Sequence, residues 1–432
     1  MLAFVKKVNE AAAGPDQWSV RRRLVVAGTL LGALAVGAAA GAGSPLFVYE
    51  QSRWQFPDWM LTALFAVYAL SLLGTLVVAG SLSDHVGRRP VLTGALLVML
   101  AASVLYLSAD DAVSLLAARA LHGVATGAAL STFTAFVAES VPPASRGTYT
   151  QLAGTVPISG LALGVLVGGL AVSSGDAPVH TVFIPLLVVY LLAIVATLAT
   201  PETVSRAPGA LRSLVPRVVV PAPLRADFRR FIPLVAATWM TTGLFLGLVP
   251  ALNRSVFGIT SGVTSALIVF LQPAAAAVTG IVASRIAAGR AALLGASGVT
   301  VGALAVMAGV AGHQLPLLII GAVLGGFGNG AGFAAVLRLL SPRAALHERA
   351  GLVAAMFVVA YLSFGVPVLI SGAALGPWGF GSTVAVYCLV LAVLGGISVV
   401  LLRTGDRRSR AVQPTPASQP VAVGRPCGGQ TG

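Results

Sequence analysis

Charged residues are scarce in this sequence, at 9% of its 432 residues. A soluble domain carries about 25% of them, because its surface must face water. The mean hydropathy is correspondingly high, at +0.93, and 57% of the residues are hydrophobic. This composition excludes an ordinary water-soluble globular domain and indicates a chain whose surface faces lipid.

Cysteine is rarer still, with Cys388 in an apolar run and Cys427 near the C-terminal end. Such a pair indicates no disulfide framework. The thirteen acidic residues are scattered, and no group of acids and histidines forms a constellation suited to catalysis or metal binding. The sequence therefore predicts no catalytic residues, no metal and no cofactor, and hence no enzyme.

Apolar runs of roughly 20 residues are abundant, and that is the length a helix needs to cross about 30 Å of hydrocarbon. The runs are continuous, whereas transmembrane barrels show alternating segments of about ten residues. We therefore expect an all-α integral membrane protein with twelve transmembrane helices. The predicted helices span 24–48, 59–80, 91–109, 112–138, 149–173, 180–199, 231–252, 262–284, 291–312, 315–337, 350–373 and 378–402.

A Pro- and Arg-rich stretch separates the first six predicted helices from the last six. The C-terminal end is basic and then rich in Pro, Gly and Gln, a composition typical of disorder. No cleavable signal is evident at the N-terminal end. The expected parts are a cytoplasmic N-terminal segment at 1–23, a six-helix bundle at 24–199, a cytoplasmic linker at 200–230, a second six-helix bundle at 231–402 and a disordered cytoplasmic tail at 403–432.

The distribution of basic residues predicts the orientation in the membrane. The net charge of +14 does not indicate a nucleic-acid partner, because no basic segment is interleaved with aromatic residues. With the N-terminus inside, 24 of the 27 Lys and Arg residues fall in inside segments, Arg119 falls within a helix, and only Arg53 and Arg254 fall outside. This bias follows the positive-inside rule. We expect a monomer in the inner (plasma) membrane with both termini cytoplasmic.

The two halves also share a short repeat. Residues 121–128 align with residues 324–331, an offset of 203, and each copy lies in the fourth helix of its half. Two halves of like topology, related by pseudo-two-fold symmetry, are typical of secondary transporters, which bind substrate at the interface between the halves. A small-molecule transporter is therefore the first functional hypothesis.

A basic loop joins the second and third predicted helices. Gly87 suits a tight turn because glycine tolerates positive φ, and Asp84 is placed to cap the turn or to pair with an arginine. Taken alone, such a loop is also what the positive-inside rule produces. The whole string resembles the signature loop of the major facilitator superfamily, G-x-x-x-D-[RK]-x-G-R-[RK], and reads Gly80-Ser-Leu-Ser-Asp84-His-Val-Gly87-Arg88-Arg89-Pro90.

The resemblance covers roughly residues 20–405 and implies two bundles that alternate access to a central cavity lined by helices 1, 4, 7 and 10. His85 departs from the pattern, which has Arg or Lys there, and the corresponding loop of the second half has Ser284 in place of the acid. In the family this loop is a conformational latch between helix ends. The resemblance assigns that role to Gly80, Asp84, Gly87, Arg88 and Arg89.

Arg119, in the fourth helix, is the candidate for a charge inside the hydrocarbon region. Such a residue is costly and marks a functional site by default, unless it snorkels to the outer surface and pairs with Asp110 or Asp111. His122 lies on the same face one turn later and either titrates or bonds a neighbouring helix. Both resemble the family's helix-4 arginine motif, in which glutamine is common at the histidine position.

The fifth helix carries glycines at four-residue spacing, which make a flat face for close helix crossing. The same residues resemble the family's antiporter motif, G-x-x-x-G-P-x-x-G-G, found in drug:proton exporters. Val165 stands where that motif has proline. Packing and antiport therefore both remain open for Gly160, Gly164, Gly168 and Gly169.

The second half offers polar and amphipathic side chains but no charge within its helices. Each of them is either structural or part of an uncharged half-site in the substrate pathway. Pro273 and Pro367 are placed to break helices near that half-site. The candidate residues are Trp239, Thr241, Thr242, Gln272, Asn329 and Tyr361.

Three functions compete. The first is a proton-coupled exporter of small hydrophobic or amphipathic molecules, favoured by the glycine motif of the fifth helix. The second is an importer or facilitator of a sugar or another small metabolite, favoured by the weakly acidic cavity. The third, a membrane enzyme or sensor, lacks the clustered acids or metal ligands that it would need.

Proton coupling needs a group that titrates and faces the cavity. No carboxylate lies deep in the predicted helices, so His122 is the candidate proton carrier and Arg119 the candidate partner of the anionic or polar part of a substrate. The rival candidates are Glu50 and Asp58, near the outer mouth.

Overall fold

The computed structural model describes residues 20–175, 177–205, 207–216 and 218–411, and all regular structure within them is helical. The first half consists of α2 (Val20–Trp54), α3 (Asp58–Ala79), α5 (Arg88–Leu107), α6 (Ala112–Ser140), α7 (Arg146–Ser174) and α8 (Pro178–Leu198). The second consists of α10 (Arg225–Gly243), η3 (Leu244–Leu248), α11 (Val249–Ser255), α12 (Gly262–Ala283), α13 (Ala288–Ala311), α14 (Leu315–Leu340) and α15 (Arg349–Ala411).

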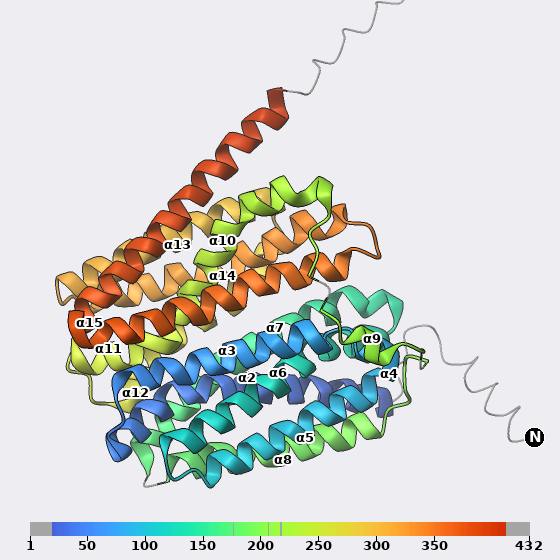
Figure 1. Ribbon diagram of the computed structural model, residues 1–432, viewed down its shortest axis with the longest axis horizontal. Coiled ribbons are helices and arrows are strands. Elements are labelled where there is room, and N and C mark those ends of the chain that lie inside the picture. The colour runs from blue at the N-terminus through green and yellow to red at the C-terminus, as the bar shows by residue number, and fades with distance from the viewer. Residues whose placement is uncertain (1–19, 176, 206, 217, 412–432) are drawn as a thin grey trace, which may run out of the picture.

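Eleven helical stretches of the described chain are long and apolar enough to cross a membrane. The longest of them, α15, holds two spans, because Gly379 takes the non-helical angles φ 74° and ψ 167° and kinks the chain. The prediction of twelve transmembrane helices is therefore confirmed. Figure 1 shows them as two bundles, one blue to green and the other lime to red.

The predicted ends of the linker and of the last helix differ from those in the structure. The linker prediction of 200–230 is too long, because α10 begins at Arg225. Arg230 in its second turn donates to the carbonyl oxygens of Leu401 and Leu402, which ties this basic segment to the last helix. The last helix passes the predicted end at 402 and continues to Ala411. The remaining parts of the predicted end segments, 1–19 and 412–432, lie outside the described residues.

The short connections add further small helices. Between α3 and α5 lies α4 (Ser83–Val86), and η1 (Pro143–Ser145) precedes α7. The connection between the two halves contains α9 (Ala210–Ser213) and η2 (Ala222–Leu224), and η4 (Ser341–Arg343) follows α14. We call the end of the molecule that carries α4, η1 and η4 the basic end, and the opposite end, which carries Asp58 and Arg254, the distal end.

Glycine determines how closely the helices cross. A Cβ at Gly123 or Gly127 of α6 would meet the backbone of α3 at Tyr68 and Leu72. The equivalent pair in α14, Gly326 and Gly330, lies against the α12 backbone at Gln272 and Ala276. The sequence repeat is thus a repeat of one packing device, in which the fourth helix of each half lies directly on the second.

The glycines of the fifth helix, α7, pack against α2, which has glycines of its own at the contact. Gly160 and Gly164 of α7 lie against the backbone of α2, and Gly37 and Gly41 of α2 lie against the backbone of α7. Neither helix leaves space for a side chain at these positions, so the two backbones are in contact over two turns. Small residues are what permits such close crossings where no water drives the helices together.

The two halves meet along two helix pairs, α7 with α12 and α3 with α15. In the first pair, Gly169 lies against Ala266. In the second, Gly372 lies against Thr62 and Gly365 against Ala69. Each pair joins one helix of each half, so the interface keeps the pseudo-two-fold relation of the halves.

Gly164 offers a test of this packing. We expect Gly164→Val to lower the free energy of unfolding by about 3 kcal/mol, because its Cβ would collide with the Ala38 carbonyl of α2. The control is Gly154→Val on the same helix, where a Cβ meets nothing within 4 Å. Thermal unfolding of the full chain in detergent measures both. Equal stability of the two variants would contradict the packing role.

Candidate functional site

Arg119 lies in the interior of the first half, with 1% of its surface exposed. Its Nε donates to the Leu64 carbonyl oxygen at 3.2 Å. Its guanidinium carbon lies 4.2 Å from the ring centroid of Tyr68, and 5.1 and 5.4 Å from those of Phe47 and Phe65. Aromatic faces attract a cation in such positions. The side chain therefore points into the bundle and does not reach Asp110 or Asp111.

No carboxylate contacts this guanidinium among the described residues. The α2 residues that face it are Phe47 and Gly43, and a Cβ at Gly43 would lie 3.5 Å from the Nη1 atom. At these two positions α2 offers the guanidinium an aromatic ring and bare backbone, and no acid. A guanidinium has five N–H donors, and a buried charge without a counter-ion is costly in a membrane protein. Arg119 is thus a buried cation that is held by a carbonyl, a histidine and three aromatic rings, without a counter-ion.

His122 lies beside Arg119 and is fully buried. The Arg119 Nη1 and the His122 Nδ1 are 3.4 Å apart. Because a guanidinium only donates, Nδ1 accepts and the ring proton is assigned to Nε2. That Nε2 makes no hydrogen bond within the described part of the chain. The rings of Tyr68 and Tyr106 contact His122 edge-on, at centroid distances of 5.2 and 6.3 Å.

The polar residues expected in the second half come together, with one exception. Asn329 donates to the Thr238 carbonyl at 3.0 Å and to the Thr242 hydroxyl, which also accepts from Gln272 at 3.4 Å. The Gln272 Oε1 is buried without a partner among the described residues. Thr241 instead donates to the Ala237 carbonyl of its own helix.

An aromatic cluster adjoins this amide network. Trp239 contacts Tyr361 at a centroid distance of 4.6 Å and Phe333 at 5.4 Å. Its Nε1 is also buried and makes no hydrogen bond in the described chain. Phe357 stacks on Tyr361 at 6.0 Å. The second half therefore presents a neutral, aromatic surface, whereas the first half presents a cation.

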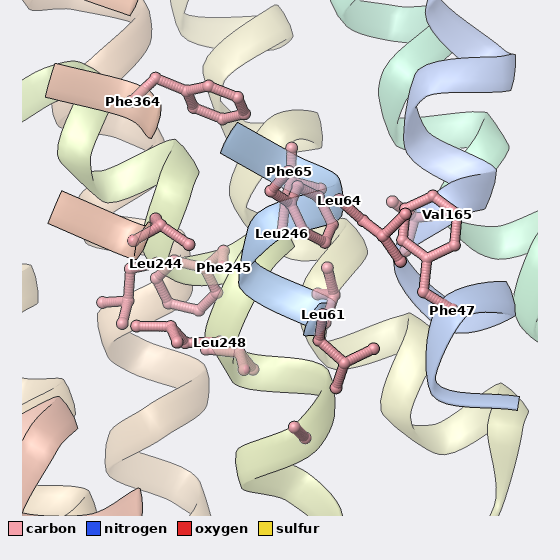
Figure 2. Packing of buried hydrophobic residues seen from close by; sticks show 14 of the residues in the cluster. Phe47, Leu61, Leu64, Phe65, Val165, Leu244, Phe245, Leu246, Leu248 and Phe364 are labelled. Carbon is pink, nitrogen blue, oxygen red and sulfur yellow. The ribbon is translucent and has the colours of Figure 1, made fainter. Parts of the chain in front are cut away.

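Large apolar side chains fill the middle of the interface between the halves, where a central cavity was expected. Figure 2 shows Phe65 of the first half close to Leu246 of the second, and the same apolar cluster includes Phe47 and Phe364. Leu246 belongs to η3, a π-helical turn that interrupts the seventh transmembrane segment, and its carbonyl accepts from the Ser44 hydroxyl of α2 at 2.8 Å. The sequence analysis missed this turn, although Gly243, Gly247 and Pro250 flank or occupy it.

The proline predictions differ from the structure. Pro273 lies inside α12 and Pro367 inside α15, and both helices continue through them. The irregular turn forms instead at η3. π-turns inside helices occur frequently at functional sites.

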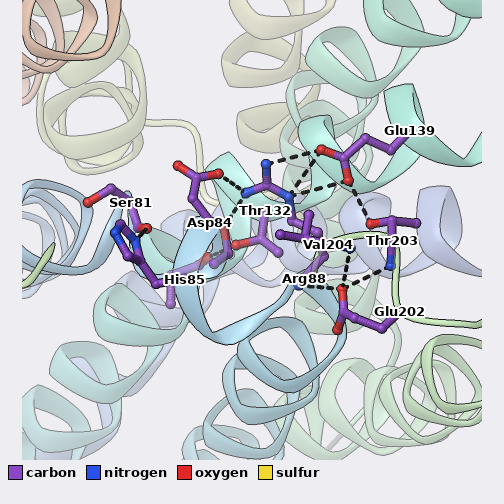
Figure 3. A network of polar contacts seen from close by, with 11 residues as sticks. Ser81, Asp84, His85, Arg88, Thr132, Glu139, Glu202, Thr203 and Val204 are labelled. Atoms are coloured by element: carbon purple, nitrogen blue, oxygen red, sulfur yellow. Dashed lines mark hydrogen bonds and ion pairs between the residues drawn. The ribbon is translucent and has the colours of Figure 1, made fainter. Parts of the chain in front are cut away.

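At the basic end, the loop with the signature pattern is held by ion pairs. Gly87 has φ 112°, as its turn requires. Figure 3 shows Arg88 between two carboxylates, at 2.5 Å from Asp84 and 3.1 Å from Glu139 at the end of α6. Glu202 accepts from the backbone N–H groups of Arg88, at 2.8 Å, and Arg89, at 3.0 Å. The sequence analysis missed Glu202, which lies more than 100 positions away.

The matching loop of the second half has different contacts. Ser284, which replaces the acid, accepts a hydrogen bond from Gln151 of α7 at 3.0 Å and so joins the two halves. Arg338 of α14 donates to the carbonyls of Ala283 and Ile286. An arginine bound to carbonyl oxygens thus holds this loop, whereas carboxylates hold the first one.

At the distal end, the Gln51 side chain bridges the two halves. Its Nε2 donates to Asp58 at 2.7 Å and to the Phe56 carbonyl, and its Oε1 accepts from Arg254 of the second half at 3.2 Å. We call Gln51, Asp58 and Arg254 the distal clasp. A cavity of about 850 Å³ lies beside it, with walls from both halves.

Comparison with known proteins identifies the family. The model of the Major Facilitator Superfamily matches residues 25–308. The chain belongs to this superfamily. The human organic anion transporter MFSD10 has a similar fold, with a TM-score of 0.64 and 18% sequence identity, over 87% of this chain and 99% of that one. The superfamily fold therefore extends over nearly all of the described helices.

Sequence relatives in the superfamily match shorter stretches. The MFS-type transporter Rv1877 of Mycobacterium tuberculosis is 34% identical over 163 residues, which are 37% of this chain and 23% of that protein. The 3-(3-hydroxy-phenyl)propionate transporter of Escherichia coli is 33% identical over 27% of this chain and 28% of its own. The arabinose-proton symporter of Bacillus subtilis is 32% identical over the same shares. The matches thus cover about a quarter of the relatives' length.

The distal clasp predicts a conformational effect. We expect Gln51→Leu to raise the ratio of distally open to closed molecules about tenfold or more, because hydrogen bonds to charged groups contribute about 1.5 to 3 kcal/mol each. Spin labels at Ser52 and Gly376, which line the distal cavity from opposite halves, report the distance.

Gln55→Asn is the control for the clasp, since Gln55 lines the same cavity but bonds only the Ser52 carbonyl of its own helix. A distance distribution that is the same in Gln51→Leu as in the unsubstituted chain would show that the clasp does not hold the distal end closed.

Proposed function

We propose that this protein is a secondary transporter that works by alternating access and exports small amphipathic molecules in exchange for protons. The observation that carries the proposal is Arg119, a buried cation with no carboxylate beside it. An anionic group of a substrate would neutralise that charge, since a guanidinium binds a carboxylate through paired hydrogen bonds.

The chemistry of the second half complements this anion site. The Trp239, Phe333, Phe357 and Tyr361 rings offer contact area to an apolar or aromatic portion, and the free Gln272 oxygen offers one acceptor. Two of the similar proteins have names that support an anionic substrate, namely an organic anion transporter and a 3-(3-hydroxy-phenyl)propionate transporter. The proposed substrate is thus an organic anion with an apolar body.

Proton coupling is assigned to His122. It is a titratable side chain 3.4 Å from the Nη1 of Arg119 and so lies within the proposed site. The ion pairs of the latch loop, Asp84 and Glu139 with Arg88, would then control the change between conformations without touching substrate. The proposed orientation places the basic end in the cytoplasm and the protein in the inner membrane as a monomer.

Import or facilitated diffusion of a sugar is the second candidate. The similarity to an arabinose-proton symporter and the uncharged amide network of Asn329, Thr242 and Gln272 favour it. Arg119 discriminates between the two functions, because a neutral sugar does not need a buried cation. Transport assays in proteoliposomes with organic anions, lipophilic cations and sugars therefore separate them.

Arg119→Gln tests the anion site. We expect the apparent affinity for an arylpropionate to fall about 30-fold or more, because removing one partner of a buried charge pair costs about 2 to 5 kcal/mol. The control is Arg285→Gln, which removes a positive charge from an exposed position at the basic end. Undiminished anion transport by Arg119→Gln would refute the anion site.

His122→Gln tests the coupling. Glutamine keeps a polar side chain of similar length but does not titrate, so we expect uphill transport to lose its pH dependence while downhill exchange of substrate persists. Flux measured between about pH 5 and pH 8 spans the range in which histidine usually changes charge. An unchanged pH dependence would make His122 a packing residue.

A further inference from the structure

A second cavity lies inside the first half at its distal end. Its volume is about 180 Å³, and its walls come from α2, α5, α6, α8 and their connections, all within one bundle. A water molecule takes about 30 Å³ in the liquid, so the cavity has room for about six. Because it is enclosed by the first half alone, it is separate from the interface where substrate is proposed to bind.

Glu50 of α2 lies in the wall of this cavity. Only 3% of its surface is exposed, and its Oε2 is 3.5 Å from the Nη1 of Arg53, a side chain that is itself more than half exposed. A carboxyl group within a transmembrane helix is costly as an anion and is retained for function in most cases. Asp58, its rival in the sequence analysis, is exposed and bonded to Gln51 in the distal clasp.

Tyr106 of α5 connects the cavity to the buried cation. It lines the cavity, where its ring stacks on Phe183 at a centroid distance of 4.4 Å, and it also contacts His122 edge-on at 6.3 Å. Its hydroxyl is buried and makes no ordinary hydrogen bond within the described residues, yet it interacts electrostatically with Arg119. The Tyr106 side chain therefore joins the cavity wall to the Arg119–His122 pair, with its hydroxyl closed off from the cavity in this conformation.

Together these groups form a route for protons through the first half. We propose that Glu50 is a proton-binding site fed from the distal side, and that a movement of the Tyr106 side chain brings its hydroxyl to the cavity water and passes the proton on to His122. In this transfer Glu50 returns to a carboxylate, Tyr106 accepts one proton and releases another, and His122 takes the proton at Nδ1, the ring nitrogen that carries none, so that the hydrogen bond from Arg119 to Nδ1 is broken. The route deepens the proton antiport of the proposed function and rests on it for its physiological role.

The surroundings of Glu50 suit such a site. The ionisable groups that line the cavity with Glu50 are Arg53 on its own helix, Tyr106 on α5 and His180 on α8. The fourth helix, α6, lines the cavity with the apolar Leu115, and its ionisable Arg119 and His122 lie outside the lining. Burial favours the protonated form of Glu50, and the charge of Arg53 favours the carboxylate.

Infrared difference spectroscopy of the full chain in lipid tests the proton site directly. We expect the carbonyl band of a protonated carboxyl group to appear as the pH is lowered, to be absent in Glu50→Gln and to remain in Asp58→Asn. The probe is the proton itself, so the result does not depend on the substrate. Persistence of the whole band in Glu50→Gln would overturn the assignment of Glu50.

The role of Tyr106 is tested by substrate-driven proton flux in proteoliposomes, with an arylpropionate as the probe. We expect Tyr106→Phe, which keeps the stacking on Phe183, to lower proton flux about tenfold or more, because a positioned proton-transfer group contributes at least that much. Tyr190→Phe is the matched control, since its hydroxyl is buried in the same half but donates to the Ala35 carbonyl at 3.0 Å. Equal flux in the two variants would refute the route.

The two measurements also separate this route from the proposed function. If the Glu50 band titrates but the unsubstituted chain couples no proton flux to an arylpropionate, the site stands and the anion antiport fails. If the unsubstituted chain couples the fluxes while Glu50→Gln keeps the band and Tyr106→Phe keeps the flux, antiport stands and the route is wrong.

Discussion

The buried positive charge of Arg119 is the feature on which the functional architecture depends. Hydrocarbon provides no water to solvate a guanidinium, so the protein must surround it, and it does so with the Leu64 carbonyl and the faces of three aromatic rings. This environment tolerates the charge without neutralising it. In the proposed function, this cation binds the anionic group of a substrate, and His122 beside it carries the proton.

The halves share one design for packing and differ in chemistry. The glycine pairs of α6 and α14 bring both fourth helices onto the second helix of their half. Across the interface, the helix pairs α7–α12 and α3–α15 each place the fifth helix of one half on the second helix of the other. The buried cation lies in the first half, whereas the second half offers amides and aromatic rings. In the proposed function, one substrate molecule would hold its charge against one half and its apolar body against the other, and so couple their movement.

The two ends of the interface are held by different interactions. At the distal end a hydrogen-bonded chain of Asp58, Gln51 and Arg254 joins the halves, and at the basic end Gln151 bonds Ser284. Between them lies a plug of apolar side chains next to the π-turn of η3. Few polar contacts need to break at either end, which is what alternating exposure of a central site requires.

The sequence by itself determined the fold class, the twelve spans, the repeat and the family, because each of these follows from the length of apolar runs, the places of glycine and arginine, and a local motif. It also picked out Arg119 and His122, since a charge within an apolar run is visible without a structure. It did not reveal Glu202, the distal clasp, or the alignment of Glu50 and Tyr106 around one cavity, because these depend on contacts between distant helices. Whether Arg119 snorkels or points inward was decided by tertiary structure alone: a helix of given sequence has the same local geometry in either case, and only its neighbours determine which side of it faces the core.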